Sequence, residues 1–328
     1  MTAPPLRIGI LGASRIAENA IVGPAHELGH RLTVVAARDR HRAESFAATH
    51  GVERVVDSYA EVIGDSEIDL IYNPLANALH GPWNLAAIAA GVPVLSEKPF
   101  ARNAVEAQQV AAQARAAGVL VLEGFHYRFH PLMHRTLDVL HSGVCGDLQT
   151  IEITMGMPEP APSDPRWEYR LAGGSIMDLG CYGLHLLRTL GPLAGGAPRI
   201  TGASAIVRGD QIDASSRIEV TFPNGATGHN TNTMLDDHYT FRAHIVGTTG
   251  SLTLHDFLSP TRDNRLSVTM ASDTRVKEVT RRSTYTFQLE AFAAALRDGT
   301  SLPIDLDDAV TNMAYIDDAY RAAGLEPR

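Results

Sequence analysis

The chain has 328 residues, of which 45% are hydrophobic and 20% are charged, a composition typical of a folded globular protein rather than a disordered or low-complexity one. Its 28 basic and 37 acidic side chains give a formal net charge of −9, which disfavours binding to nucleic acid or to an anionic membrane, and no run of about 18 apolar residues could span a membrane. The two cysteines cannot make a disulfide framework or a structural zinc site, the segment 1–5 has no secretory signal pattern, and the length favours two domains, so we expect a two-domain cytoplasmic protein.

The first 125 residues predict an alternation of short strands and helices. Continuous apolar or β-branched runs mark the strands, at 6–11, 32–37, 55–56, 69–73, 92–96 and 119–123. Ala-rich stretches mark the helices, at 16–28, 40–50, 82–90 and 104–117. Strands that are buried on both faces, with helices between them, indicate a doubly wound parallel sheet. We therefore expect residues 1–125 to form a Rossmann-type nucleotide-binding domain.

After Phe125 the pattern changes to alternating polar and apolar residues. A helix is expected at 131–141, and strands are expected at 148–155, 199–207, 217–222, 225–232, 239–246, 251–254 and 266–270. Gly173-Gly174 opens a further helix that runs to about residue 190, and a last helix at 305–323 could pack back between the domains. We expect residues 126–328 to form an α+β domain with a large, mostly antiparallel sheet that is open on one face.

A turn of small residues follows the first strand. The segment Gly12-Ala13-Ser14-Arg15-Ile16-Ala17 keeps the first glycine of the dinucleotide-binding GxGxxG pattern and has Ser14 and Ala17 at the other two positions. Small residues between a buried strand and a helix let backbone N–H groups approach a pyrophosphate, so we predict cofactor contacts at Gly12, Ser14, Arg15 and Ile16. A small-residue turn without a ligand is the alternative.

Arginines stand at the end of the second strand, where NAD enzymes usually place a carboxylate for the ribose hydroxyls. Arg38 occupies this position and Arg42 lies close by. Because guanidinium donors suit a 2′-phosphate, we favour NADP as the cofactor. Asp39 keeps NAD possible, and a solvated helix start is the alternative interpretation of the arginines.

The motif Ser96-Glu97-Lys98-Pro99-Phe100 carries a family resemblance. With the nucleotide turn and the segments 73–80, 91–99, 123–131 and 173–182, it resembles the glucose–fructose oxidoreductase / inositol dehydrogenase / MocA (Gfo/Idh/MocA) family over roughly residues 6–190. Ser14 and Ala17, and Asn73 where Ser or Thr is common, depart from the family pattern.

The resemblance implies NAD(P)-linked oxidation or reduction of a sugar, polyol or related alcohol. It also implies a second domain whose open sheet mediates a homodimer or homotetramer. Tyr182, rather than His, looks closest to the sugar and dihydrodiol dehydrogenase branch, which often uses NADP. The cofactor groove would include Pro74, Asn77, His80, Glu97 and Lys98. For Glu97 an ordinary ion pair is as good an interpretation, and His80 could simply start a helix.

The expected chemistry requires a donor for the charge on the reacting oxygen and a carrier for its proton. Lys98 follows a buried strand at the ligand-binding edge of the sheet, and it is one of only two lysines, with Lys277, in a chain that otherwise uses Arg. Asp178, Tyr182 and His185 have the i, i+4, i+7 spacing of one helix stripe.

We predict Lys98, Asp178 and Tyr182 to be catalytic. Tyr182 would carry the proton, Asp178 would orient the site or bind a substrate hydroxyl, and His185 is the fallback proton carrier. A surface lysine, a core tyrosine, a structural carboxylate and a structural histidine are the respective alternatives.

The substrate pocket is expected to use aromatic and Arg side chains, which suit the faces and hydroxyls of a sugar. The candidates are Tyr127, Arg128, Trp167, Arg170 and His185. Asp236-Asp237-His238 lacks further nearby ligands, so we predict no metal site. Two rival functions stay open: an enzyme that retains NAD and processes glycosides without net redox change, and a sensor of NAD(P) or sugar without turnover.

Overall fold

The computed structural model describes residues 4–328, so part of the segment searched for a secretory signal, residues 1–3, lies outside the described residues. The chain divides into two compact units. The first unit combines the chain up to His126 with Tyr285–Val310, and the second combines Tyr127–Thr284 with Thr311–Arg328. The chain therefore crosses between units three times, where a single boundary at 125/126 was predicted. Among residues 4–328, no helix is both long and apolar enough to cross a membrane.

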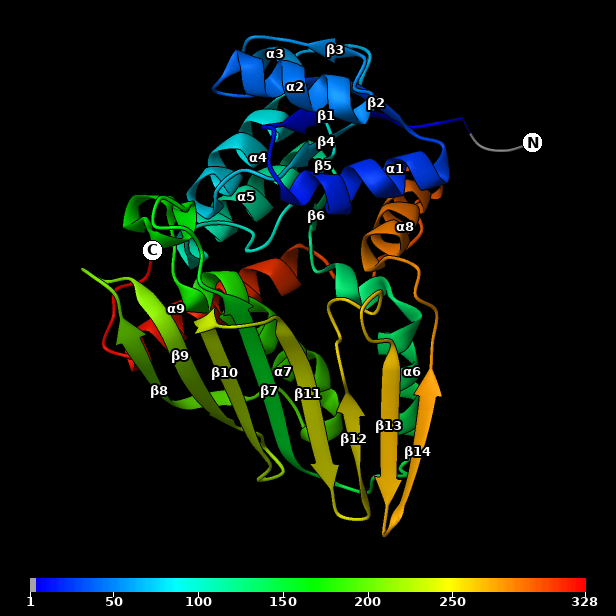
Figure 1. Ribbon diagram of the computed structural model, residues 1–328, viewed down its shortest axis with the longest axis vertical. Coiled ribbons are helices and arrows are strands. Elements are labelled where there is room, and N and C mark those ends of the chain that lie inside the picture. Colours follow the sequence, from blue (N-terminus) through cyan, green and yellow to red (C-terminus); the bar gives the residue numbers. More distant parts are fainter. Residues whose placement is uncertain (1–3) are drawn as a thin grey trace. The chain divides into compact units, whose positions relative to one another are not determined.

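The first unit contains a six-stranded parallel sheet in the order β3-β2-β1-β4-β5-β6, which confirms the predicted fold class (Figure 1). Its strands are β1 (Arg7–Leu11), β2 (Arg31–Ala36), β3 (Arg54–Val55), β4 (Leu70–Asn73), β5 (Val94–Ser96) and β6 (Val121–Glu123). Strands β4, β5 and β6 are buried along their whole length, as expected for a sheet covered on both faces. This strand order places a topological switch point between β1 and β4, where such sheets bind ligands.

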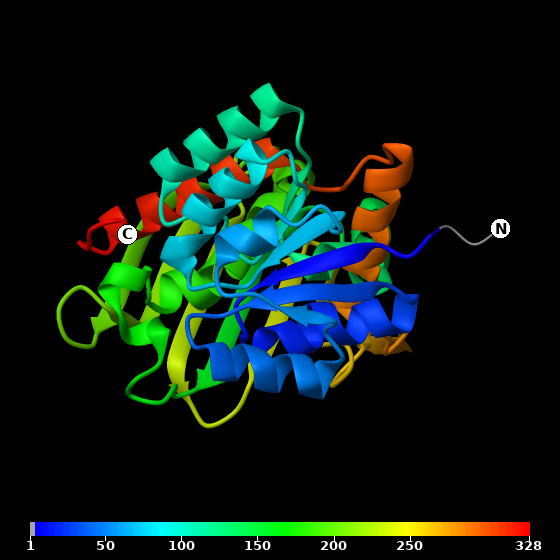
Figure 2. The same ribbon diagram turned by 90° about the horizontal axis from the view of Figure 1, so that it is seen from above.

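Helices cover both faces of this sheet, and the dark blue and teal helices lie on either side of the blue strands in Figure 2. The helices are α1 (Gly23–Leu28), α2 (Arg40–His50), α3 (Tyr59–Ile63), α4 (His80–Ala89), α5 (Ala104–Ala117) and α8 (Thr284–Asp298), with a 3-10 turn at Asn77–Leu79. The helix predicted at 16–28 is in fact a π-helical turn, Glu18–Val22, followed by α1. Helices α3 and α8 were not predicted.

The second unit contains an eight-stranded sheet in the order β14-β13-β12-β11-β7-β10-β9-β8, whose strands lie side by side in Figure 1. The strands are β7 (Leu148–Pro158), β8 (Arg199–Val207), β9 (Asp213–Thr221), β10 (Thr227–Asp236), β11 (Thr240–Gly247), β12 (Gly250–Leu254), β13 (Arg265–Met270) and β14 (Asp273–Glu278). Only the β7–β10 pair is parallel, so the sheet is mostly antiparallel, as predicted. Strand β14 was not predicted.

One face of this second sheet is packed and the other is open. Along β9, Ile218 and Val220 are buried, whereas the alternate residues Arg217 and Glu219 are more exposed. The helices of this unit are α6 (Pro131–His141), α7 (Cys181–Leu190) and the larger part of α9 (Leu306–Ala322), and α7 packs against β7 and β10. Short 3-10 turns lie at His126–Phe129, Pro165–Trp167, Tyr169–Leu171 and Gly191–Ala194.

Candidate active site

The carboxyl ends of three neighbouring parallel strands carry the predicted cofactor segments. Strand β1 leads into the Gly12 turn, β4 ends at Asn73, and β5 ends at Ser96 just before Glu97 and Lys98. Asn73 and Ser96 are register partners, so the segments that follow them leave the sheet side by side. This brings the glycine turn, the 73–80 segment and the Glu97-Lys98 segment to one edge of the first unit.

The turn after β1 is tight, and its first residue has a backbone conformation that favours glycine. Gly12 has φ +94°, and a Cβ at this position would lie 2.9 Å from Cδ2 of Leu75, so only glycine fits. Its N–H donates to Ala36 O at 2.7 Å. The Oγ atom of Ser14 is buried and has no hydrogen-bond partner among residues 4–328, and Arg15 and Ile16 are exposed. A hydroxyl left without a partner beside a glycine turn fits an incoming phosphate or ribose oxygen.

The basic residues after β2 differ in how they are engaged. The Asp39 carboxylate caps α2 by accepting from the N–H groups of His41 and Arg42, at 2.9 and 3.4 Å. Arg42 donates to Ala13 O at 3.0 Å, so it reaches the nucleotide turn, and Arg40 is paired with Glu44 and Asp57. Arg38 is exposed, and it forms no ion pair in the described part of the chain.

A buried polar network holds the segment that leads to Lys98. The Tyr72 hydroxyl donates to Glu97 Oε1 at 2.9 Å, and the Glu97 N–H donates to Asn73 O at 2.9 Å. Burial, together with the neighbouring Glu97 charge, raises the pKa of Tyr72 well above its ordinary value, so this phenol stays a donor. Asn84 accepts from Asn73 at 2.8 Å and donates to Ser96 Oγ at 3.0 Å. Lys98 itself is half-buried and is joined to Pro99 by a cis peptide bond.

His80 connects two loops of this edge through both of its ring nitrogens. It is the first residue of α4 and is fully buried. Its Nδ1 lies 2.7 Å from Pro99 O and its Nε2 lies 2.8 Å from Leu75 O, and a neutral ring can donate to only one of them. Burial lowers the pKa of His80 to about 4, and the Lys98 charge acts in the same direction. Pro74 is buried and Asn77 is half-buried in the same segment.

In the second unit, Asp178 lies in a π-helical turn (Ile176–Gly180) that runs directly into α7, where a single helix was predicted. Two side-chain amides complete the junction: Asn230 on β10 donates to Gly180 O at 3.0 Å, and Asn312 on α9 donates to Cys181 O at 3.2 Å. A π-turn disturbs the regular hydrogen-bond pattern of a helix, so carbonyls near it need other donors. The predicted single stripe of Asp178, Tyr182 and His185 therefore spans two kinds of helix.

Asp178 is bound to an arginine that the sequence analysis did not single out. Arg166 Nε donates to Asp178 Oδ2 at 2.6 Å, and Arg166 Nη1 lies 3.2 Å from Asp164 Oδ1. The bond to Arg166 fixes the direction of the Asp178 carboxylate. The residue is 9% exposed, so a small part of it remains accessible. The one local signal for Arg166 is its place two residues after Asp164, which caps the turn Pro165–Trp167.

Tyr127 and His185 form a buried pair next to Tyr182. The Tyr127 hydroxyl lies 2.6 Å from His185 Nδ1, and the Tyr127 ring contacts the rings of Tyr182 and Phe257, with centroids 6.3 and 5.3 Å apart. Tyr127 and His185 are 0% and 1% exposed, and Tyr182 is 4% exposed. Both residues of the pair were predicted as substrate contacts; in this structure they contact each other, and Tyr127 packs against the Tyr182 ring.

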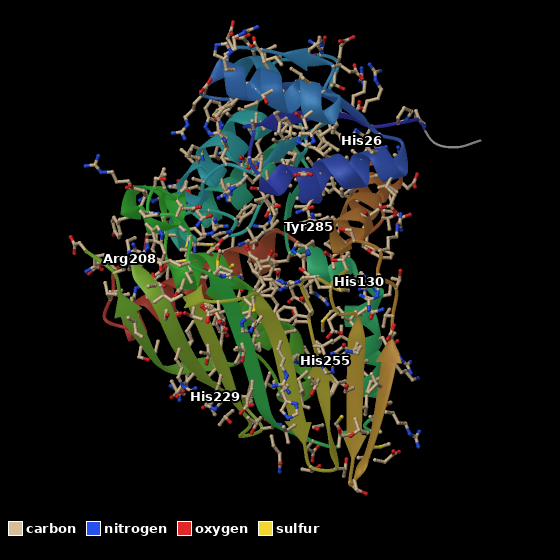
Figure 3. All side chains as sticks on the ribbon, viewed as in Figure 1. His26, His130, Arg208, His229, His255 and Tyr285 are labelled. Carbon is tan, nitrogen blue, oxygen red and sulfur yellow. The ribbon has the colours of Figure 1, made fainter. Side chains whose placement is uncertain are left out.

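The remaining substrate candidates differ in their surroundings. Nε and Nη1 of Arg128 are buried and have no hydrogen-bond partner within residues 4–328. Trp167 is half-buried, donates to Pro160 O at 3.1 Å and stacks under Arg208, which is labelled in Figure 3, at 4.5 Å from the ring centroid. Arg170 is exposed. Among residues 4–328, no group of three or more His, Cys, Asp or Glu side chains could hold a metal ion.

Comparison with known proteins extends these observations over the whole chain. Residues 6–125 match the model of an oxidoreductase family with an NAD-binding Rossmann fold, and residues 133–253 match the GFO/IDH/MocA C-terminal domain. The D-xylose 1-dehydrogenase (NADP(+)) 2 of Haloferax volcanii is 30% identical over 321 residues, which cover 97% of each chain. The trans-1,2-dihydrobenzene-1,2-diol dehydrogenase of Mus musculus is 30% identical over 259 residues, covering 78% of this chain and 76% of the mouse protein.

Solved structures agree in fold. The crystal structure of a 3-ketoreductase from Actinomadura kijaniata, in complex with NADP and TDP-benzene, superposes with a TM-score of 0.87 at 25% identity and covers 97% of this chain and 98% of that one. Both domain models together match more than half of the chain, in the order and positions of the two folds described above. The chain therefore belongs to the Gfo/Idh/MocA family of oxidoreductases.

Proposed function

We propose that this protein is an NADP-linked oxidoreductase that transfers a hydride between the nicotinamide and a carbinol or carbonyl carbon of a sugar, polyol or dihydrodiol-like substrate. The relatives named above act, by name, on D-xylose with NADP(+) and on a dihydrodiol, and the ketoreductase was solved with NADP. The observation that carries the proposal is the place of Lys98: it follows β5, at the same sheet edge as the Gly12 turn, two strands away.

The cofactor contacts follow from the first unit. The turn formed by Gly12, Ser14, Arg15 and Ile16 would hold the pyrophosphate through backbone N–H groups and the Ser14 hydroxyl. Arg38 would bind the 2′-phosphate, with Arg42 beside it. Asp39, the carboxylate that could instead serve the ribose of NAD, caps a helix. Pro74, Asn77 and Glu97 would line the groove, with His80 behind them. When bound, the nicotinamide supplies or accepts the hydride.

The chain's own residues would manage the charge and the proton of the reacting oxygen. In the oxidation direction, Tyr182 in its phenolate form would accept the hydroxyl proton, and in reduction its neutral phenol would return that proton. The Lys98 ammonium stabilises the negative charge that develops on the oxygen. Asp178, whose direction is fixed by Arg166, accepts a hydrogen bond from a substrate hydroxyl. Tyr127 and His185 hold Tyr182 in place from behind.

Substrate contacts and assembly complete the proposal. The two buried donors of Arg128 that have no partner among residues 4–328 fit substrate oxygens, and Trp167 and Arg170 supply an aromatic edge and a cation. We place the protein in the cytoplasm, as a homodimer or homotetramer formed through the open sheet. Ile206 and Val207 at the end of β8 are 65% and 45% exposed, which supports such an interface.

A substrate panel tests the function directly. Sugars, polyols and dihydrodiols are incubated with NADP or NAD, and the absorbance of the reduced nicotinamide is followed. We expect net reduction of NADP with at least one class of substrate. Cofactor that stays bound through purification, with glycoside cleavage but no net absorbance change, would favour the glycoside-processing alternative. Cofactor binding without turnover of any compound would favour the sensor.

Arg38→Asp tests the choice of cofactor. Removing one charge-assisted contact and adding a like charge should raise the KM for NADP by about 10- to 100-fold, while the KM for NAD changes little. Steady-state kinetics with both cofactors provide the measurement. Arg40→Ser is the control, because Arg40 is already paired with Glu44 and Asp57. This variant should leave the ratio of the KM values for NADP and NAD unchanged. An equal loss with NADP and NAD in Arg38→Asp contradicts the 2′-phosphate role.

A further inference from the structure

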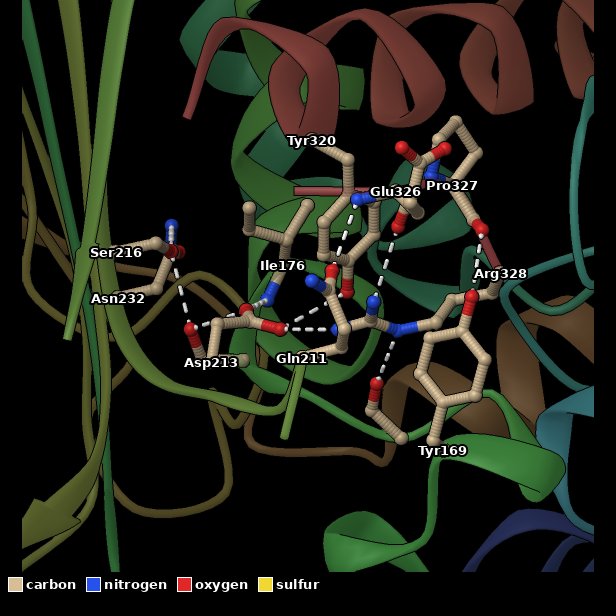
Figure 4. Close-up of polar contacts among 12 residues, drawn as sticks. Tyr169, Ile176, Gln211, Asp213, Ser216, Asn232, Tyr320, Glu326, Pro327 and Arg328 are labelled. Carbon is tan, nitrogen blue, oxygen red and sulfur yellow. Dashed lines mark hydrogen bonds and ion pairs between the residues drawn. The ribbon is translucent and has the colours of Figure 1, made fainter. Parts of the chain in front are cut away.

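The most completely buried ion pair of the second unit lies outside every residue assigned above. Arg328 Nη2 lies 2.7 Å from Asp213 Oδ1, and both side chains are 0% exposed (Figure 4). Burying two charges carries a desolvation penalty that is often not recovered as stability, so such a pair is better explained by what it positions. Asp213 is the first residue of β9, and Arg328 follows α9, so the pair joins segments 115 residues apart.

The Asp213 carboxylate binds the start of the helix that carries the catalytic candidates. Its Oδ2 accepts from the Ile176 N–H at 2.6 Å and from the Ser175 hydroxyl at 2.9 Å. Its Oδ1 accepts from the Tyr320 hydroxyl at 3.1 Å and from Arg328. Ile176 opens the π-helical turn that contains Asp178, and its N–H is one of the amides that a helix start leaves without an internal partner.

The Arg328 guanidinium binds the other side of the same entry. Its Nε donates to Gly173 O at 2.8 Å, and it stacks on the Tyr320 ring at 4.0 Å and on the Tyr169 ring at 5.1 Å. Arg328 therefore binds the Gly173 carbonyl directly, and it binds the Ile176 N–H indirectly, through the Asp213 carboxylate. The fork geometry of a guanidinium allows both contacts at once.

The pair requires a glycine at position 174, whereas Gly173 is required by the backbone of Arg166, whose carbonyl oxygen would lie 2.4 Å from a Cβ there. Gly174 has φ +119°, and a Cβ there would lie 2.0 Å from Asp213 Oδ1 and 2.9 Å from Arg328 Nη2. Its N–H donates to Arg166 O at 3.0 Å, and its carbonyl accepts from the Asp178 N–H at 3.0 Å. Gly174, which lies in the loop bound by Arg328 and Asp213, is therefore hydrogen-bonded to the backbone of both Arg166 and Asp178, the two partners of the ion pair.

We infer that Arg328 and Asp213 are positioning residues, which fix the entry of the helix that bears Asp178 and Tyr182 and so set the reactivity of the site. This inference rests on the proposed function for the roles of Asp178 and Tyr182. Neither positioning residue touches the reacting atoms. Their effect passes through the backbone at Gly173, Gly174 and Ile176, where a displacement of about 1 Å is enough to lower turnover by about 100-fold.

Arg328→Ala is the central test. We expect kcat to fall by about 10- to 100-fold while the Kd for NADP, measured by NADPH fluorescence, stays within about twofold of the wild type. Millimolar guanidinium chloride should restore part of kcat by filling the vacated site, and sodium chloride should not. Arg321→Ala is the control on α9, since Arg321 is exposed and its ion pairs among residues 4–328 are with Asp318 at 2.8 Å and, more distantly, with the buried Asp317 at 3.8 Å, not with Asp213. Lys98→Met should show no rescue.

Two further measurements keep the test decisive. Amide hydrogen exchange of Arg328→Ala, which requires no substrate, should become faster across residues 173–182, so the inference can be judged even if no substrate of the proposed class is turned over. If Arg328→Ala does not fold, Arg328→Lys replaces it; because lysine lacks the guanidinium fork, its kcat should be reduced. A folded Arg328 variant with wild-type kcat, or with unchanged exchange at 173–182, overturns the inference.

Discussion

Replacing Lys98 by methionine is expected to lower kcat by about 100- to 1,000-fold while leaving the affinity for NADP within about twofold. Methionine keeps most of the length and apolar stem of lysine but removes the ammonium, and the developing charge on the reacting oxygen loses its fixed cation. Tyr72 and Asn73 bind Glu97, and Asn84 binds Ser96, through hydrogen bonds that Lys98→Met would leave in place, so the segment should keep its backbone position. Steady-state kinetics and NADPH fluorescence separate the two effects.

The chain contains a matched control for this substitution. Lys277, the other lysine, lies on the fully exposed strand β14, and Lys277→Met should leave both kcat and cofactor affinity unchanged. Full activity of a folded Lys98→Met variant would remove Lys98 from the mechanism. A fall in cofactor affinity as large as the fall in kcat would instead make Lys98 a residue that only binds the cofactor.

Replacing Tyr182 by phenylalanine should lower kcat by about 100- to 10,000-fold, the usual range for loss of a general acid or base. The ring contact with Tyr127 does not need the Tyr182 hydroxyl, so phenylalanine should preserve the packing of this buried position. In the oxidation direction the carrier must accept a proton, so wild-type kcat should rise as pH increases through the pKa of the carrier. The variant should lose this pH dependence along with its activity.

Three companion variants help to decide which residue carries the proton. Tyr127→Phe removes the hydroxyl that lies 2.6 Å from His185 Nδ1, and we expect a smaller loss of kcat than in Tyr182→Phe because Tyr127 only supports the site. Tyr315→Phe is a control on α9, at a half-buried tyrosine whose hydroxyl donates to Pro198 O, and it should have no effect on kcat. If Tyr182→Phe keeps its pH dependence and His185→Asn loses it, the proton belongs to His185.

Much of the first unit could be predicted because its elements depend on local pattern. The strands are short continuous apolar runs, and α2 and α5 were placed at their observed ends from their Ala-rich stretches; in the structure Asp39 and Asn103 cap their beginnings. The missed helix α3 is only five residues long, but Ser58 and Glu61 form a capping box that signals it. The missed strand β14 is exposed along its whole length, so it has no buried alternate residues to give a pattern.

Site residues in contiguous motifs could be predicted from the sequence, whereas those whose partners lie far along the chain could not. The nucleotide turn and the Glu97-Lys98 segment are short stretches whose place at the sheet edge follows from the βα alternation. Arg166 was not predicted as a site residue, because its role depends on Asp178, which lies 12 residues later in the chain and 2.6 Å away in the fold. Tyr127 and His185, 58 residues apart in the chain, were taken separately as substrate contacts, and only the fold shows that they bind each other.

The amino-acid sequence by itself determined the class of the two folds, the sheet edge at which the Gly12 turn and the Glu97-Lys98 segment lie, and the family, because these follow from periodicity, small residues in turns and contiguous motifs. The tertiary structure alone decided which polar groups are paired inside the second unit. The Asp213–Arg328 pair, the amides of Asn230 and Asn312, and the π-helical turn that they stabilise join segments far apart in the chain. A buried charge or carbonyl must be matched by whatever donor the fold brings to it, and sequence spacing carries no record of that partner.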